Sequence, residues 1–87
     1  MTEDALRDVV KRALLHIAPE ADLTAVSQTA DLREELDLDS MDLLNFFVAL
    51  HEKLNVDIAE ADYGRLATLD GCVKYLSERL ALHAAPR

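Results

Sequence analysis

The chain has 87 residues, is 51% hydrophobic but only 5% aromatic, and carries a formal net charge of −8 from 17 acidic and 9 basic residues. This length allows one domain with one small core, which favours a surface crevice over a deep catalytic cleft. The negative charge argues against binding to nucleic acid or anionic membranes and predicts partners that present basic patches.

The stretch MTEDALRDVV has neither the positive flank nor the apolar core of a signal peptide, and no apolar run approaches the length of a membrane span. Cys72 is the single cysteine and the three histidines are scattered, so neither an internal disulfide nor a metal site is expected. Cys72 is interpreted as a small buried apolar residue. We expect a cytoplasmic monomer without membrane insertion.

An amphipathic helix is predicted over residues 3–17. At 100° per residue, one stripe collects its apolar side chains, which are Leu6, Val9, Val10, Ala13, Leu14 and Ile17. Thr2 is the expected N-cap, and Pro19 lies just beyond the end. This stripe provides the first face of the core.

Residues 18–39 show no sustained period, and a connection this long is unusual in a small domain unless it has a role. Asp31 and Glu34 have the spacing of a capping box, which predicts a short helical turn over residues 32–36. Three leucines are expected to reach the core from this loop: Leu23, Leu32 and Leu36.

A second long helix is predicted from Ser40 to about Leu54. Its apolar arc spans roughly 200°, wider than a one-sided stripe, so this helix is expected to be the central one. The apolar residues are Leu43, Leu44, Phe46, Phe47, Val48, Leu50 and Leu54. The remaining narrow face carries Met41, Asp42, Asn45, Ala49, Glu52 and Lys53.

A short helical stretch is predicted over residues 59–65, followed by a final helix that Thr68 caps and that runs to about Leu82. The expected fold is an all-α, small four-helix bundle of three long helices and one short helix, with a long first loop. Residues 1–82 form the predicted domain, and residues 83–87 a flexible C-terminal tail.

The pair Asp39-Ser40 stands where the long loop becomes the second helix. With Asp39 as N-cap, Ser40 is the first helical residue and its hydroxyl faces solvent, beside N–H groups that tolerate a phosphate. A serine nucleophile would need a base and an oxyanion hole, but no Gly-x-Ser-x-Gly elbow is present and His51 lies about three turns along the same helix. Two interpretations remain: a plain helix start, or a serine modified by another enzyme.

The stretch DLREELDLDSMDLLNFFVALHEKLNVDIAEADYGRLATLDGCVKYL resembles the acyl carrier proteins and related phosphopantetheine-binding domains. It follows their order of long loop, signature, central helix, short helix and closing helix, and the resemblance extends from Leu6 to Leu80. Asp39-Ser40-Met41 corresponds to the family signature, usually Asp-Ser-Leu.

This resemblance implies that Ser40 accepts 4′-phosphopantetheine from coenzyme A through a phosphopantetheinyl transferase, which also reads Asp39 and Met41. The arm's thiol would carry an acyl group as a thioester, and the chain would not be an enzyme. The positions where relatives meet an acyl ligase or synthase are Met41, Asp42, Asn45, Ala49 and Glu52. The wall that would receive an acyl chain is Leu44, Phe47, Val48, Leu50, Ile58, Tyr63, Leu66 and Cys72.

Several positions depart from the family pattern. Asp37 replaces a common glycine, so the loop before the signature is expected to be tighter or differently solvated, and Ala59 replaces a common proline. Asn45 replaces an acidic residue, and His51 and Lys53 dilute the charge of the partner face. Phe46 and Phe47 stand where smaller aliphatic residues are usual, and their bulk narrows the room for a long acyl chain.

These departures favour a freestanding acyl carrier for a specialised fatty-acid or polyketide-type pathway. An aminoacyl or peptidyl carrier of a nonribosomal system is the alternative within the family. Outside the family, the first alternative is an unmodified helical interaction module that binds a basic partner, and the next is an enzyme that pairs Ser40 with a histidine.

Overall fold

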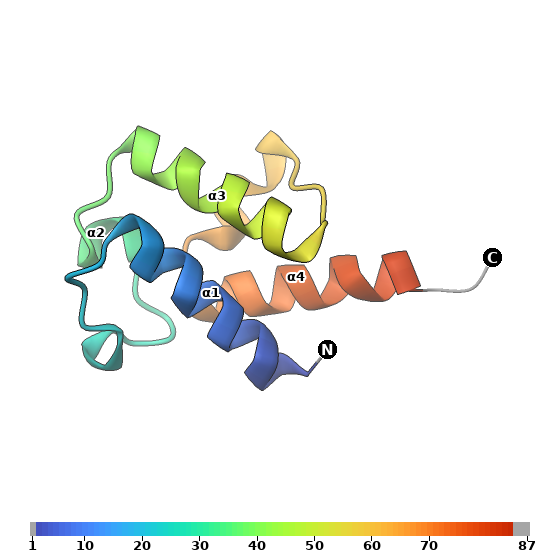
Figure 1. Ribbon diagram of the computed structural model, residues 1–87, viewed down its shortest axis with the longest axis horizontal. Helices are drawn as coiled ribbons and strands as arrows, with labels where there is room; N and C mark the ends of the chain where they lie inside the picture. The colour runs from blue at the N-terminus through green and yellow to red at the C-terminus, as the bar shows by residue number, and fades with distance from the viewer. Residues whose placement is uncertain (1, 85–87) are drawn as a thin grey trace.

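The computed structural model describes residues 2–84, and every regular element in that range is helical. In chain order the elements are α1 (Glu3–Ile17), η1 (Leu23–Ala25), α2 (Leu32–Glu35), α3 (Ser40–Leu54), η2 (Glu60–Leu66) and α4 (Leu69–Ala84). The predicted all-α fold, with three long helices and a long first loop, is confirmed (Figure 1). Within residues 2–84, no helix combines the length and hydropathy needed to cross a bilayer.

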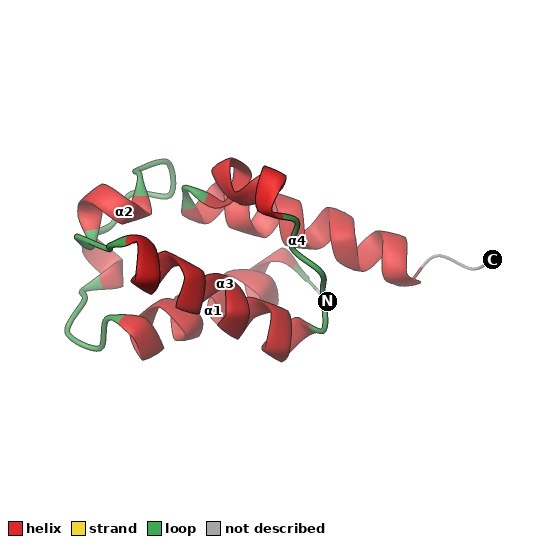
Figure 2. Cartoon of the chain, turned by 90° about the horizontal axis from the view of Figure 1, so that it is seen from above, coloured by secondary structure: helices red, strands yellow, loops and turns green. Residues whose placement is uncertain are grey.

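Helix α1 packs closely against both α3 and α4, while α4 also packs against η2. Helix α3 contacts α1 on one side and η2 on the other, where the rings of Phe47 and Tyr63 meet, so it touches neighbours on two sides as expected, although α1 and α4 do so too. Part of its wide apolar arc stays at the surface: Leu44 and Val48 remain 46% and 45% exposed. Seen from above, α4 extends past the end of the other helices (Figure 2).

Local capping explains where the helices begin. Thr2 caps α1 through its hydroxyl, which accepts a hydrogen bond from the N–H of Ala5 at 3.1 Å. Thr68 does the same for the N–H of Gly71 at the start of α4, at 2.9 Å. Helix α4 ends at Ala84, two residues further than expected, and the rest of the expected tail, residues 85–87, lies outside the described residues.

The core is built from apolar side chains of all the helices and of the long loop. Leu23 and Leu32 are buried as expected, whereas Leu36 is only partly buried. Tyr75 of α4, which the sequence pattern did not single out, is also fully buried. Its hydroxyl donates a hydrogen bond to Asp62 Oδ2 at 2.9 Å, which satisfies the polar end of the ring and ties α4 to η2.

Two backbone hydrogen bonds fix the long loop against the start of α4. The N–H of Leu32 donates to the carbonyl of Ala67 at 2.8 Å, and the N–H of Asp70 donates to the carbonyl of Gln28 at 3.0 Å. Arg7 reinforces the junction by contacting both Gln28 and Asp70. The start of α2 is thereby held against the junction between η2 and α4.

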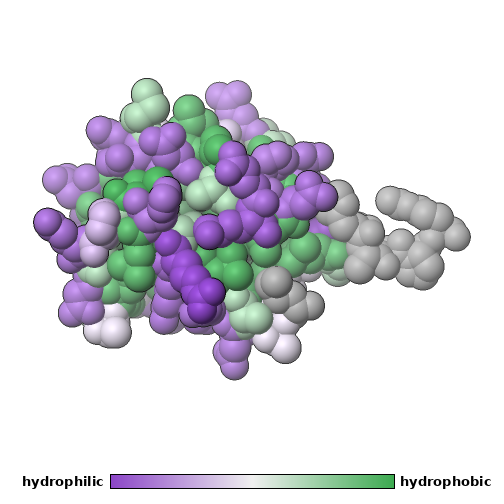
Figure 3. Space-filling model, viewed as in Figure 1, coloured by the Kyte–Doolittle hydropathy of each residue, from purple (hydrophilic) through white to green (hydrophobic). Residues whose placement is uncertain are grey.

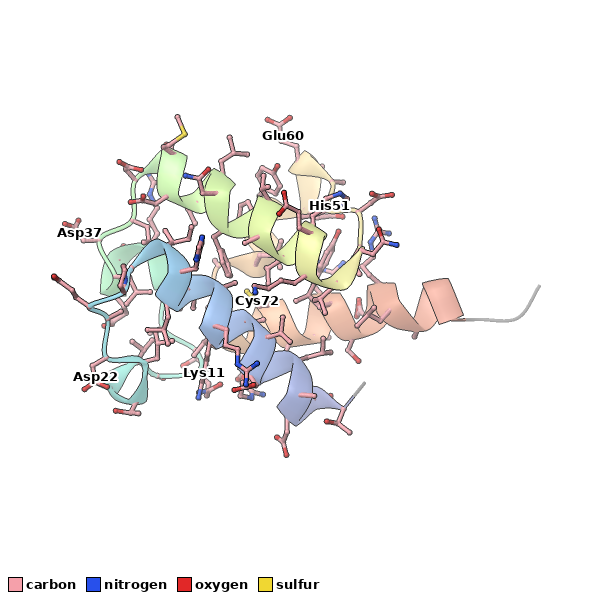
Figure 4. All side chains as sticks on the ribbon, viewed as in Figure 1. Lys11, Asp22, Asp37, His51, Glu60 and Cys72 are labelled. Carbon is pink, nitrogen blue, oxygen red and sulfur yellow. The ribbon has the colours of Figure 1, made fainter. Side chains whose placement is uncertain are left out.

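The turn between α2 and α3 contains Asp37 in the left-handed conformation, with φ of 52°. The N–H of Leu38 donates to the carbonyl of Arg33 at 2.9 Å, as in a Schellman ending of a helix. Aspartate is one of the few residues other than glycine that adopt this conformation readily. Asp37 thus provides the backbone shape that a glycine would, and Figure 4 shows its side chain pointing away from the bundle.

Candidate functional site

Ser40 is exposed at the first position of α3, immediately after the capping residue Asp39. The N–H of Asp42 donates to Asp39 Oδ1 at 2.8 Å, and the N–H of Asp39 donates to Asp42 Oδ2 at 3.3 Å. This reciprocal pair is a capping box built from two aspartates. It fixes the helix start and leaves the Ser40 side chain directed to solvent.

An apolar cavity of about 500 Å³, the Ser40 crevice, opens beside this serine between α3 and η2. Its lining residues are Asp31, Arg33, Ser40, Leu43, Leu44, Phe47, Tyr63, Gly64, Leu66 and Ala67. Its polar residues, Asp31, Arg33 and Ser40, come from the chain around the start of α2 and the start of α3. Elsewhere on the molecule, apolar patches also reach the surface between hydrophilic side chains, as on the face in Figure 3.

A second cavity of about 220 Å³ lies further along α3. It is lined by Phe47, Val48, His51, Asp57, Ile58 and Tyr63. Phe47 and Tyr63 line both cavities, and their ring centroids are 4.3 Å apart. This aromatic pair therefore stands between the Ser40 crevice and the second cavity.

The structure divides the residues predicted as an acyl-chain wall into three groups. Those that line the Ser40 crevice are Leu44, Phe47, Tyr63 and Leu66. Val48 and Ile58 line the second cavity with the aromatic pair. Leu50 and Cys72 line neither of these two cavities and are fully buried in the core.

Sequence reasoning did not assign five of the crevice residues to the site: Asp31, Arg33, Leu43, Gly64 and Ala67. Helical spacing could have assigned Leu43 to the site, because it lies one turn after Ser40 on the same face of the helix. Gly64 is a glycine inside a helical segment, and a Cβ at this position would meet no atom within 4 Å. The contribution of α2 depends on contacts distant in sequence and has no local signal.

The predicted partner face forms a shallow groove of about 420 Å³ between the end of α1 and α3. Its lining residues are His16, Ile17, Asp42, Asn45, Val48, Ala49 and Glu52. Met41 does not line this groove and is 63% exposed beside Ser40. Four of the five predicted partner residues thus line one surface that begins next to the serine.

Within residues 2–84, the Ser40 crevice contains no histidine, and no cluster of side chains suited to a metal ion is found. His51 lies near the far end of α3 (Figure 4), where its Nδ1 is 2.9 Å from the carbonyl oxygen of Val56. His16 lines the partner groove. Neither of these histidines therefore lies beside the Ser40 hydroxyl in the crevice.

Cys72 points into the interior, as Figure 4 shows, and its Sγ donates to the carbonyl of Leu66 at 3.3 Å. Burial raises the pKa of this thiol to about 12. A thiol this buried and this weakly acidic is neither a nucleophile nor an acyl carrier at neutral pH. Cys72 is therefore not a candidate site for covalent chemistry in the folded protein.

Comparisons with known proteins agree with this geometry. A family model described as phosphopantetheine attachment site matches residues 4–76. The chain is 33% identical over 78 residues to acyl carrier protein from Chlamydia muridarum, covering 86% of this chain and 96% of that protein. It is 30% identical over 80 residues to polyketide-8 synthase acyl carrier protein 2 from Streptomyces avermitilis, covering 92% and 86%. It is 29% identical over 80 residues to acyl carrier protein from Petrotoga mobilis, covering 92% and 93%.

The helical fold and an exposed serine at a helix start define a small carrier domain. The family match extends over most of the chain, and the chain belongs to the acyl carrier proteins, the family that carries 4′-phosphopantetheine covalently. Members of this family are carriers and not enzymes. They interact with phosphopantetheinyl transferases and synthases.

Proposed function

We propose that Ser40 is the attachment residue for 4′-phosphopantetheine and that the arm's thiol carries acyl groups as thioesters. The observation that carries this proposal is the exposed hydroxyl at the first position of a 15-residue helix, capped by Asp39 and bordering an apolar crevice. In the transfer step, Ser40 Oγ bonds to the pantetheine-bearing phosphorus of coenzyme A and the phosphoanhydride bond breaks. Adenosine 3′,5′-bisphosphate leaves, and the serine proton passes to the transferase.

The position of Ser40 suits a permanently attached anion. The first N–H groups of a helix have no partner inside the helix, and the helix dipole places partial positive charge there. A phosphodiester on Ser40 would lie at this end of α3 without entering the core. The lining residues Leu43, Leu44 and Phe47 then offer an apolar wall along the same helix for the attached chain.

The crevice supports acyl groups that are short enough to end before the aromatic pair. Phe47 and Tyr63 close the far side of the Ser40 crevice and separate it from the second cavity. The apolar character of the wall favours acyl over aminoacyl or peptidyl cargo, because an unpaired polar group in such a crevice is costly to desolvate. Loading assays with each substrate class distinguish the two.

Partner enzymes would contact the groove between α1 and α3 and the exposed Met41. Asp42 and Glu52 give this surface a negative character, whereas Asn45 and Ala49 leave gaps in it. A transferase and an acyl ligase or synthase with basic patches would fit such a surface. The reduced acidity supports a specialised fatty-acid or polyketide-type pathway, and one relative is named as the carrier of a polyketide synthase.

The test is intact-mass measurement after incubation with coenzyme A and a broad-specificity transferase. The expected result is the gain of one phosphopantetheine by the wild-type chain and none by Ser40→Ala. Ser77→Ala, which changes a serine on α4, is the matched control and should gain one. The same gain in Ser40→Ala would move the attachment elsewhere, and no gain in the wild type would favour an unmodified interaction module.

A further inference from the structure

Arg33 is the only lysine or arginine between Arg12 and Lys53. The acidic residues of the same stretch are Glu20, Asp22, Asp31, Glu34, Glu35, Asp37, Asp39, Asp42 and Glu52. A single cation in such a segment is most simply explained as a partner for one of these carboxylates. The structure does not show that arrangement.

Among the described residues, Arg33 differs from the other arginines in its side-chain contacts. The others each bond an acceptor: Arg7 to Asp70, Arg12 to Asp8, Arg65 to Glu78, and Arg79 to the carbonyl of Asp57. Within residues 2–84, no ion pair or hydrogen bond is found for the guanidinium of Arg33. Its nearest acid in sequence, Asp31, instead accepts the backbone N–H groups of Arg33 and Glu34 at the start of α2.

The backbone of Arg33 is firmly placed although its side chain is exposed. Its carbonyl accepts the N–H of Leu38, and the preceding residue, Leu32, bonds the carbonyl of Ala67 across the molecule. These contacts hold Arg33 on the wall of the Ser40 crevice, which Ser40 also lines. A cation without an internal partner and the attachment hydroxyl therefore share one small cavity.

We infer that the Arg33 guanidinium binds the phosphodiester attached to Ser40 and so directs the prosthetic arm over the crevice. This inference rests on the proposed attachment at Ser40. The phosphodiester adds a negative charge next to Asp39 and Asp42, and Arg33 is the basic residue that lines the same cavity. A guanidinium matches phosphate oxygens in a forked geometry that a lysine cannot reproduce. Arg33 is a positioning residue, since it contacts the arm and not the thioester.

The interaction is measured by a thermodynamic cycle between attachment and residue 33. Urea unfolding is followed for apo and holo forms of the wild type, Arg33→Gln and Arg33→Lys. The apo forms should differ little, because the Arg33 side chain has no internal partner to lose. In the holo form, Arg33→Gln should lower the ratio of folded to unfolded protein by up to about fivefold, which is the upper range for an exposed ion pair. Arg33→Lys should lower the same ratio by a smaller factor, because it keeps the positive charge.

Arg12→Gln is the matched control, because Arg12 pairs with Asp8 on the outer side of α1. It should change the apo and holo forms equally. A direct readout is the side-chain Nε–Hε resonance of Arg33, which should shift when the apo protein becomes holo and shift back in high salt, while that of Arg12 stays in place. Equal effects of Arg33→Gln on apo and holo forms, or an unmoved Arg33 resonance, would overturn the inference.

Two further measurements identify the anion that Arg33 binds and distinguish a failure of this inference from a failure of the proposed attachment. Holo protein loaded with a hexanoyl or a succinyl group distinguishes the phosphodiester from a carboxylate at the end of the cargo. A shift that appears only with the succinyl group assigns Arg33 to the cargo and contradicts the inference. Intact mass is measured first in every case, so a failed attachment to Ser40, which overturns both proposals, is distinguished from a failed contact with Arg33.

Discussion

The ring of Tyr63 on η2 lies against the ring of Phe47 on α3, with centroids 4.3 Å apart and 31° between the ring planes. Such tilted pairs contribute about 0.5–1.5 kcal/mol beyond the area they bury. Both rings line the Ser40 crevice on one side and the second cavity on the other. A contact that stabilises the fold is thus also the partition between two apolar spaces.

Tyr63→Ala should join the two cavities and let longer acyl chains bind inside the carrier. Each additional methylene that is buried contributes about 0.8 kcal/mol, so two of them should slow attack on the thioester by about fifteenfold. The measurement is the rate of thioester cleavage by hydroxylamine for butyryl, octanoyl and dodecanoyl groups. In Tyr63→Ala the longer groups should gain protection relative to the butyryl group.

Tyr63→Phe is the control for this experiment, because it keeps the ring and removes only the hydroxyl. Its length profile should match that of the wild type. Urea unfolding of both variants separates a lost partition from a lost fold. If Tyr63→Ala folds and carries the arm but shows the wild-type length profile, the aromatic pair does not limit the chain.

Asp39 combines two roles that substitution can separate. Its carboxylate caps α3 by accepting the N–H of Asp42, and removal of a cap costs about 0.5–2 kcal/mol. Asp39→Ala should therefore lower the free energy of unfolding by about 1 kcal/mol in urea titrations. Asp39→Asn should be nearly neutral for stability, because asparagine caps helices about as well as aspartate.

The transfer reaction then tests the second role. If the transferase reads the charge of Asp39, the rate of phosphopantetheine attachment should fall in Asp39→Asn as well as in Asp39→Ala. If it needs only a well-formed helix start, Asp39→Asn should react like the wild type. A loss of stability in Asp39→Asn equal to that in Asp39→Ala would contradict the capping geometry.

The helix boundaries were accessible from the sequence because they depend on neighbours in the chain. α1 and α3 begin and end where periodicity and caps place them, and Thr2 and Asp39 act as the predicted N-caps. The signature serine was also found, since a capping residue before an apolar run is a local pattern. At Asp37, however, the left-handed backbone is present without the glycine that usually allows it, which local residue preferences alone did not indicate.

The crevice was only partly predictable. A helical wheel separates apolar from polar directions, but it does not tell whether an apolar side chain is buried or lines an open cavity. Leu50 and Leu44 belong to the same arc, yet the first is fully buried and the second is 46% exposed. The place of α2 depends on the bond from Leu32 to Ala67, two residues far apart in sequence. Arg33 enters the site for that reason.

A single added methyl group should destabilise the protein at one of its two glycines and not at the other. A Cβ on Gly71 would lie 2.3 Å from the carbonyl oxygen of Arg65, so the start of α4 and the end of η2 would have to move apart. Gly71→Ala should cost about 1–3 kcal/mol in urea unfolding, as overpacking does. Gly64→Ala is the matched control, because its Cβ would meet no atom within 4 Å. A neutral Gly71→Ala would show that the two elements can separate freely.

The buried thiol provides a direct distinction between apo and holo protein. Alkylation requires the thiolate, and burial raises the pKa of Cys72 to about 12, so at pH 8 only about one folded molecule in ten thousand would carry it. Iodoacetamide should therefore leave the folded apo protein unlabelled by intact mass and add one group to the holo protein, on the thiol of the arm. Unfolding in urea should expose Cys72 and allow one label on the apo chain. Labelling of the folded apo protein at the unfolded rate would mean that the core around α4 opens readily, and would contradict the packing described for Cys72.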